Sequence, residues 1–338
     1  MDIPQPEDYQ IGWIYALQLE LTAAKVFFDK EYPQPQDAAQ NDNNNYVLGR
    51  MGKHHIVVAG LPLGQTGNNS AATVLKDMVR SYPNLRFVLM VGIGGGVPNA
   101  KNNLREECEN EIHLGDVVVS APSGQHGAVI QYDFGKEHQD RGFEFTGYQN
   151  LPSATLLGAI PTLQSNHDID GTDSLANRIE ERLNLKPKLR KTYGRPENKT
   201  DKLYSSDFVH VDGNATCNEC DETKIIRRGR EDEDKVPRVH YGLIASGNKV
   251  MRDAKQRDFL AKEKGVLCFE MEAGGLMNSW SCLVVRGICD YSDSHKHKKW
   301  QQYSALSAAS YARELLDLIP QQRIGGDQKI ADQISKDG

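Results

Sequence analysis

The sequence lacks long apolar runs and a targeting segment. Its longest apolar stretches, such as residues 87–93, are far shorter than the roughly 18 residues of a membrane helix. The segment from Met1 to Pro6 is acidic and rich in proline, without the basic start and apolar core of a signal peptide. We therefore expect a cytoplasmic protein that does not engage a membrane.

Cysteine is scarce, and neither sign of charge dominates. The 338 residues include 6 cysteines, and 40 lysines and arginines stand against 46 acidic residues, which gives a formal net charge of −6. In a long chain without a secretory signal, such cysteines indicate reduced thiols. Mild acidity excludes a surface that tracks a nucleic acid polymer. The chain is long enough to bury a large core.

Short β-rich runs alternate with helical patterns. This alternation predicts an α/β fold with a mixed, mainly parallel central sheet flanked by helices. The predicted strands are residues 9–16, 46–50, 54–61, 86–91, 116–120, 239–246, 266–269 and 282–289, and the predicted helices are 19–30, 69–81, 252–264, 272–279 and 300–319. We expect one domain at residues 8–320, followed by a tail or linker at 321–338.

A polar segment at about residues 185–238 breaks this rhythm. It is rich in proline, glycine and asparagine and has no sustained period, so we interpret it as an irregular insertion in the domain. Residues 186–202 carry seven basic side chains against two acidic ones, in an otherwise acidic protein. A solvated basic loop and a phosphate-binding surface both agree with this excess.

Candidate functional residues follow the predicted strands, where open α/β sheets place their ligands. Residues 92–96 have the sequence Gly-Ile-Gly-Gly-Gly. Such glycines either let the backbone approach a ligand closely or form a simple tight turn. Glu270 and Glu272 form either a diol-binding pair or an acidic first helical turn. Asp290 ends an apolar strand and is suited to general acid catalysis if burial raises its pKa. Glu20, alone, is an ordinary first-turn glutamate.

Together, these motifs resemble the purine nucleoside phosphorylase and methylthioadenosine nucleosidase superfamily over about residues 9–320. The matching motifs, in chain order, are the first strand with Glu20, the glycine-rich turn, Leu114 to Ser120, Ser246-Gly247-Asn248, Glu270-Met271-Glu272 and Arg286 to Asp290. One of these motifs would be weak evidence, whereas six in the right order are strong. The resemblance implies the superfamily's central sheet with flanking helices.

The resemblance also implies roles for individual residues. Asp290 matches the acid that protonates N7 of a leaving purine, and Glu272 matches the carboxylate that holds the ribose hydroxyls, with Met271 packed against the sugar. The same resemblance assigns to the substrate pocket Gly92, Ile93, Gly94, Ser246, Asn248, Val250, Met251 and Glu270. Glycosidic cleavage passes through an oxocarbenium-like state, so an acid at the base and stabilisation of the sugar are required.

The identity of the nucleophile divides this superfamily. Phosphorylases hold phosphate with cationic and hydroxyl groups, and they typically place an arginine and a serine or threonine where this chain has Met90 and Ile93. Glu20 stands where nucleosidases place the base that activates water, and Arg286 is expected to position Glu20 or the water. The resemblance therefore favours hydrolysis. Nucleosidases often have a serine at the position of Ile93. Without that hydroxyl group, the attacking water would have one hydrogen-bond partner fewer.

The chain is most similar to fungal-type members with this insertion, which often begin nucleotide-binding receptor-like proteins, and to ATP nucleosidases of defence systems. This implies cleavage of ATP to adenine and ribose 5-triphosphate without a cofactor. Lys136, Arg195 and Lys202 are candidate phosphate ligands, and residues 295–299 (His-Lys-His-Lys-Lys) lie near Asp290 in sequence. The alternatives are a phosphorylase or nucleosidase of adenosine, inosine or methylthioadenosine, and a non-catalytic nucleoside sensor. The resemblance also suggests a homodimer or higher oligomer.

One short cysteine motif lies in the insertion. Cys217 and Cys220 are separated by two residues, with His210 upstream. A structural zinc ion needs four ligands, usually from two such pairs, and the chain has one. We therefore expect no metal and read the pair as reduced thiols in a surface loop, with a zinc clip on the insertion as the alternative.

Overall fold

The apolar runs of the sequence form the strands of one large sheet. A computed structural model describes residues 3–34, 41–98, 111–124, 126–140, 142–147, 149–211, 216–226, 236–277 and 280–334. In this part of the chain, ten strands belong to the main sheet. They are β1 (Ile11–Tyr15), β2 (Lys30–Tyr32), β3 (Tyr46–Met51), β4 (His54–Gly60), β5 (Phe87–Gly96), β6 (Val117–Ser120), β7 (Val129–Gln131), β10 (Val239–Ser246), β11 (Val266–Glu270) and β12 (Cys282–Asp290).

The sheet is mixed and curls on itself. Its strand order is β11-β10-β6-β12-β5-β1-β4-β3-β2, with β7 beside β10. The pairs around its centre, β12–β5, β5–β1 and β1–β4, are parallel, whereas β12–β6 is antiparallel. The far end of β5 also pairs antiparallel with β11, through Gly96 and Gly95, so five strands close into a ring. The predicted α/β class and mainly parallel sheet are confirmed.

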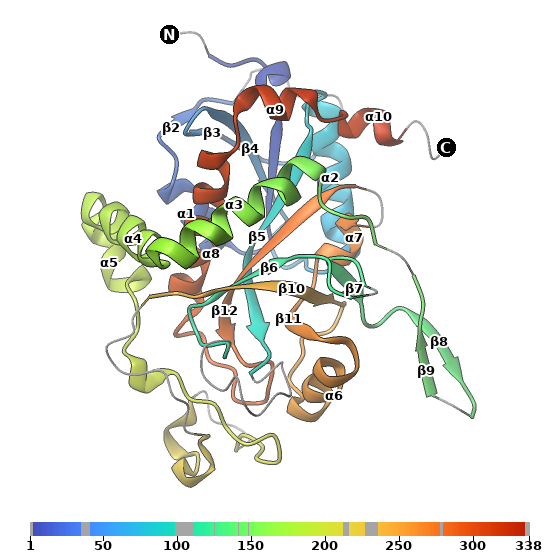
Figure 1. The fold of residues 1–338 in the computed structure, drawn as a ribbon, viewed down its shortest axis with the longest axis vertical. Helices are drawn as coiled ribbons and strands as arrows, with labels where there is room; N and C mark the ends of the chain where they lie inside the picture. Colours follow the sequence, from blue (N-terminus) through green and yellow to red (C-terminus); the bar gives the residue numbers. More distant parts are fainter. Residues whose placement is uncertain are drawn as a thin grey trace.

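Helices cover this sheet in Figure 1. They are α1 (Gln18–Val26), α2 (Asn68–Ser81), α3 (Ala154–Asp170), α4 (Asp173–Leu185), α5 (Pro187–Tyr193), α6 (Ala254–Lys264), α7 (Ala273–Met277), α8 (Gln301–Leu318), α9 (Gln321–Gly326) and α10 (Ile330–Ile334). The α8 helix is buried on most sides, because alanines and serines at helical spacing let it approach the sheet closely. At Gly287 of β12, an added Cβ would lie 1.8 Å from the carbonyl oxygen of Ser304.

Three features differ from the sequence prediction. The strand predicted at 86–91 continues through the glycines to Gly96, so these residues form a strand and not a turn. The start of the insertion contains the helix α5. Residues 321–334 are no free tail: they form α9 and α10, whose Ile324 and Ile330 are fully buried, and the amide of Ile330 donates to the carbonyl of Leu85 at 2.9 Å. Apolar side chains in that short segment explain its packing.

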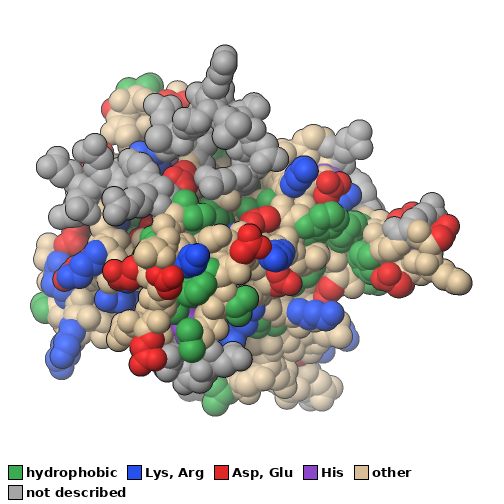
Figure 2. Space-filling model, turned by 90° about the horizontal axis from the view of Figure 1, so that it is seen from below, with side chains coloured by type: hydrophobic (Ala, Val, Ile, Leu, Met, Phe, Trp, Pro, Cys, Tyr) green, Lys and Arg blue, Asp and Glu red, His purple; other side chains and the backbone are tan. Residues whose placement is uncertain are grey.

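The insertion lies beneath the carboxyl ends of β5 and β12, at the bottom of Figure 1. Its Asp201 accepts a hydrogen bond from the hydroxyl of Tyr291, and Arg257 donates to the Tyr291 carbonyl at 2.7 Å and to the Ser206 hydroxyl at 3.1 Å. The insertion is therefore fastened to the chain that follows β12. In Figure 2, which shows the molecule from this end, basic and acidic side chains are interspersed.

A two-stranded hairpin, β8 (Gly135–His138) and β9 (Gly142–Phe145), projects from the body of the protein in Figure 1. None of the helices in the described ranges combines the length and the apolar character that a membrane span requires.

Candidate active site

A cavity of about 210 Å³ opens at the carboxyl ends of β5, β11 and β12, beside the start of α1. Parallel strands bring their carboxyl ends to one edge, which is where α/β sheets bind ligands. Ten of the predicted site residues line this cavity: Glu20, Ile93, Gly94, Val250, Met251, Glu270, Met271, Glu272, Arg286 and Asp290. The sheet therefore brings together residues that are up to 270 positions apart in the chain.

Glu20 is buried at the first turn of α1 and is held by backbone donors from two elements. Its Oε2 accepts the amides of Ala16 and Leu17, both at 2.8 Å, and its Oε1 accepts the amide of Ile93 at 2.8 Å. An ionised carboxylate offers about four lone-pair sites. Three are used, so one site on Oε1 remains for a further donor, such as a water molecule.

Gly92 permits this arrangement through the absence of a side chain. A Cβ on Gly92 would lie 2.2 Å from Oε1 of Glu20 and 2.8 Å from Nη1 of Arg286. Both side chains therefore cross directly over the backbone of β5. The glycine in this strand makes room for two charged side chains, and Gly92 itself is not among the residues that line the cavity. This differs from the prediction that Gly92 contacts substrate.

Glu270, Glu272 and Arg286 form a buried ionic group. Nη2 of Arg286 lies 2.5 Å from Glu270 and 3.5 Å from Glu272, and Glu270 also accepts the amides of Glu272 and Ala273, at 3.0 Å each. Glu270 thus caps α7 and anchors Arg286. Burial lowers the pKa of Arg286, but the charges of Glu270, Glu272 and Glu20 outweigh this effect and raise it.

Glu272 faces the cavity with an unusual protonation equilibrium. Burial, together with the negative charges of Glu270 and Glu20, raises the pKa of its carboxyl group to about 7, although the positive charge of Arg286 lowers this pKa. Its Oε1 lies 3.5 Å from the amide of Gly67, and its Oε2 lies 3.3 Å from the amide of Met271. These long contacts leave the carboxylate able to accept stronger hydrogen bonds from a ligand.

Asp290 ends β12 at the opposite side of the cavity from α7. Its Oδ1 accepts the amide of Ser292 at 2.8 Å and lies 3.2 Å from Nζ of Lys296. Ser292 has a positive φ of 55°, which turns the chain sharply after the strand. Its Cβ and Oγ also lie close to the backbone of Gly95, where an added Cβ would be 2.1 Å from Oγ. This turn places the side chains of Asp290 and Lys296 together.

Two of the predicted pocket residues support the wall of the cavity instead of lining it. The Ser246 hydroxyl donates to Oδ1 of Asn68 at 3.1 Å and accepts the amide of Gly274 at 2.9 Å. Oδ1 of Asn248 accepts the amide of Asn68 at 3.2 Å. Ser246 and Asn248 are therefore not among the residues that line the cavity, and their polar atoms join the end of β10 to α2 and α7.

None of the three predicted phosphate ligands lines this cavity. Lys136 is exposed on the projecting hairpin, Lys202 pairs with Glu222 at 2.7 Å, and the Arg195 guanidinium lies 5.2 Å from the ring centroid of Trp300. Two other lysines, Lys249 and Lys296, line the cavity. Lys296 belongs to the basic run near Asp290 in the sequence, and Lys249 lies between the predicted pocket residues Asn248 and Val250, although neither was nominated as a phosphate ligand.

Other lining residues were not nominated individually from the sequence, although Gly95 and Cys289 lie within its motifs. They include Ala16, Leu17, Thr66, Gly95, Phe269, Cys289 and Gln301. In the described residues, the candidate metal ligands that lie close together are His210, Cys217 and Cys220, and none of these three lines the cavity.

Comparison with known proteins identifies the fold. A 5'-methylthioadenosine/S-adenosylhomocysteine nucleosidase of Mycobacterium bovis is 23% identical over 279 residues, covering 80% of this chain and 84% of that protein. A crystal structure of the 5'-methylthioadenosine/S-adenosyl homocysteine nucleosidase of Helicobacter pylori aligns with a TM-score of 0.52 at 16% identity, over 92% of this chain and 98% of that chain. The chain therefore shares the fold of these nucleosidases. The resemblance inferred from the motifs is confirmed.

A stretch of a longer protein is more similar in sequence to this chain than these two nucleosidases are. A nucleotide-binding leucine-rich repeat (NLR)-like protein of Hyaloscypha variabilis is 44% identical over 321 residues, which is 94% of this chain. The chain spans about 30% of the length of that relative. No family model matches the chain.

Proposed function

We propose that the protein hydrolyses the N-glycosidic bond of a purine nucleotide, ATP in particular, and releases adenine and ribose 5-triphosphate. The observation that carries this proposal is the convergence of Glu20, Glu272 and Asp290 on one small cavity. Each comes from a different element of the superfamily fold, and each carries a carboxyl group in a different environment. The three groups match the three tasks of the reaction: to activate water, to hold the sugar and to protonate the base.

Departure of the purine requires a proton on the base. Asp290 is the acid in this proposal, because its Oδ2 is free of the Ser292 and Lys296 contacts that occupy Oδ1. Oδ2 has one weak donor, the Cys289 thiol at 3.5 Å. Lys296 lies 3.2 Å from Oδ1 and supplies a positive charge beside the site when Asp290 gives up its proton. A positioned acid of this kind contributes about 10²- to 10⁴-fold in rate.

Water attacks the sugar carbon as the purine leaves. The remaining lone pair on Oε1 of Glu20 accepts a proton from this water, and the three backbone amides fix the carboxylate. Glu272 accepts hydrogen bonds from the ribose hydroxyls. The positions that phosphorylases use for phosphate carry Met90, which is buried in the sheet, and Ile93, which lines the cavity with an apolar side chain. This favours water over phosphate as the nucleophile.

The nucleotide assignment rests on Lys249, an exposed cation on the cavity wall, because Lys296 already pairs with Asp290. Cations near the sugar stabilise the negative charge of a polyphosphate. The similarity to a nucleotide-binding protein over 94% of this chain is consistent with such a substrate. The second candidate is methylthioadenosine, because Ile93, Met251 and Met271 give the cavity apolar surface that would pack against a methylthio group.

The decisive experiment is chromatography of purified protein incubated with ATP, adenosine, inosine and methylthioadenosine, each with and without phosphate. We expect free adenine from ATP in the absence of phosphate. Base release from nucleosides only, and only with phosphate, would refute hydrolysis. Adenine release from methylthioadenosine but not from ATP would replace the nucleotide assignment with the second candidate.

The acid can be tested with Asp290→Asn and two leaving groups. We expect a loss of about 10²- to 10⁴-fold with a purine substrate. A riboside with a nitrophenolate leaving group needs no proton, so its cleavage should fall much less. The matched control is Asp207→Asn, since Asp207 is an exposed carboxylate that pairs with Lys255 at the surface. Equal losses with both leaving groups would mean that Asp290 is not the acid.

A further inference from the structure

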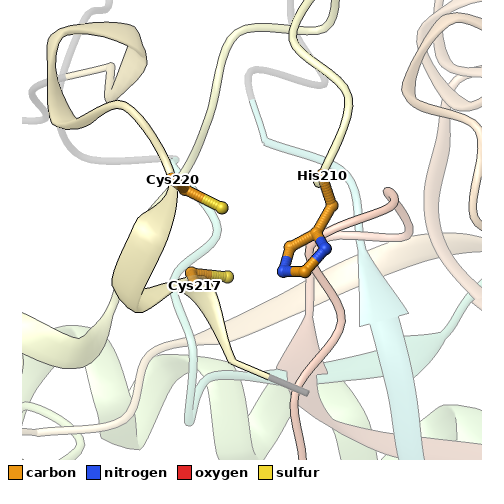
Figure 3. A group of neighbouring side chains, drawn as sticks. All are labelled: His210, Cys217 and Cys220. Carbon is orange, nitrogen blue, oxygen red and sulfur yellow. The ribbon is translucent and has the colours of Figure 1, made fainter. Parts of the chain in front are cut away.

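Three side chains of the insertion converge at a point outside the cavity. Cys217 begins the short helical turn η3 (Cys217–Glu219), Cys220 follows it directly, and His210 comes from the preceding stretch of the insertion. Figure 3 shows the two thiols pointing towards the imidazole ring. One ligand atom from each residue lies within 4.8 Å of the other two. Cys220 is buried, whereas His210 and Cys217 are half-buried.

This spacing suits a single tetrahedral ion. With metal–sulfur bonds of about 2.3 Å, two sulfur ligands of a tetrahedral zinc ion are separated by roughly 3.8 Å. Ligand atoms within 4.8 Å of one another therefore need only small side-chain movements to reach one ion. Thiolate and imidazole ligands favour zinc, whereas calcium and magnesium prefer oxygen ligands.

We propose that His210, Cys217 and Cys220 bind one Zn²⁺ ion. Binding displaces the protons of the two thiols, and the imidazole coordinates in its neutral form. Among the described residues, the group contains three possible ligands, which leaves one position of a tetrahedral ion for a further ligand.

The ion would hold together the part of the insertion that packs against the chain that follows β12. The amide of His210 donates to the hydroxyl of Ser294 at 2.9 Å, and the Cys217 thiol lies 3.8 Å from the carbonyl oxygen of His295. The rings of His210 and His295 lie 5.4 Å apart. His295 directly precedes Lys296, which contacts Asp290. The proposed zinc site therefore has a structural role next to the segment that borders the cavity.

Metal content tests the site without any assumption about activity. We expect about one zinc per chain by mass spectrometry of the purified protein after dialysis, and less than a tenth of this in a Cys217→Ser, Cys220→Ser double variant. The control is Cys282→Ala, which removes a thiol buried in β12 and should leave the zinc content unchanged. Zinc below a tenth per chain in the parent protein would overturn the proposal, as would equal zinc in the double variant.

Cobalt provides a second test if the double variant fails to fold. Metal-free parent protein should take up one Co²⁺ per chain and gain a thiolate-to-cobalt absorption band, which zinc should abolish. His210→Ala should bind cobalt at least tenfold more weakly. An absence of this band, or a Cys217–Cys220 disulfide in the freshly purified protein, would overturn the proposal.

Discussion

Replacing Glu272 with glutamine should stabilise the protein at alkaline pH while it removes activity. Glu272 is buried beside Glu270 and Glu20, and burial raises the pKa of its carboxyl group from the ordinary value of 4.5 to about 7. The folded protein therefore binds this proton more tightly than the unfolded chain does. As the pH rises from 4.5 to 7, this contribution to the free energy of unfolding is lost, because the folded state must then hold a buried charge.

The size of the effect follows from this shift in pKa. At about 1.4 kcal/mol per unit, the wild-type protein loses roughly 2.5 kcal/mol of this contribution between pH 5 and pH 8. Glutamine has no charge at either pH, so the variant does not lose it. With an unfolding entropy of about 2.1 cal/mol/K per residue, a chain of 338 residues should gain about 3 to 4 °C in melting temperature at pH 8 relative to pH 5.

The assay is thermal unfolding of both proteins at pH 5 and pH 8, with Glu31→Gln as the control, because Glu31 is an exposed carboxylate paired with Lys25. The difference in melting temperature between Glu272→Gln and wild type should be larger at pH 8, and the control should show no such trend. A difference that is independent of pH, or larger at pH 5, would refute the reasoning. Turnover should fall in parallel, since an amide accepts the ribose hydroxyls less strongly than a carboxylate does.

Three further substitutions probe the same site. Glu20→Gln should lower turnover by about 10²- to 10⁴-fold, because the base that activates water is removed; the measurement is the rate of base release. It should also lower stability by about 1 to 3 kcal/mol, because the glutamine NH2 group cannot accept the backbone amides that one carboxylate oxygen accepts. Gly92→Ala should lower turnover about 100-fold, because its methyl group would lie 2.2 Å from Oε1 of Glu20 and displace it. Arg286→Met should lower the free energy of unfolding by about 3 to 5 kcal/mol in chemical denaturation, because it leaves Glu270 and Glu272 buried without their cation.

Two of these have a matched control. Gly158→Ala places a methyl group on α3 with no atom within 4 Å, so it should be neutral, and similar activity of the Gly92 and Gly158 variants would contradict the close approach over β5. Arg190→Met breaks an exposed pair with Glu180, and an equal cost at Arg286 would argue against a buried ionic group. Unchanged turnover in Glu20→Gln would remove Glu20 from the mechanism.

The pattern of the sequence predicted the core strands because short apolar runs rich in β-branched residues favour strands that are buried on both faces. The runs at 282–289 and 239–246 match β12 and β10 closely. The prediction failed at residues 92–96, where glycine was taken to end a strand. Tertiary contact decided otherwise: the side chains of Glu20, Arg286, Cys268 and Ser292 lie so close to this backbone that any Cβ would clash, and β11 pairs with it.

The candidate site shows the same division. Motifs in the sequence nominated Glu20, Glu272 and Asp290, because each carboxylate directly follows a predicted strand, and the fold brought them to one cavity. Basic side chains could not be assigned in this way. The charge excess at 186–202 pointed to Arg195 and Lys202, but their side chains contact Trp300 and Glu222. Lys249, which was not nominated as a phosphate ligand, lines the cavity instead.

The sequence by itself therefore determined the α/β class, the order of the strands along the chain and the acidic residues of the site, since these depend on local pattern and short motifs. Only the tertiary structure decided which side chains line the cavity, that residues 92–96 continue a strand, and that His210 lies beside Cys217 and Cys220. The physical reason is that a long side chain can reach several partners, and only the packing of distant segments selects one of them.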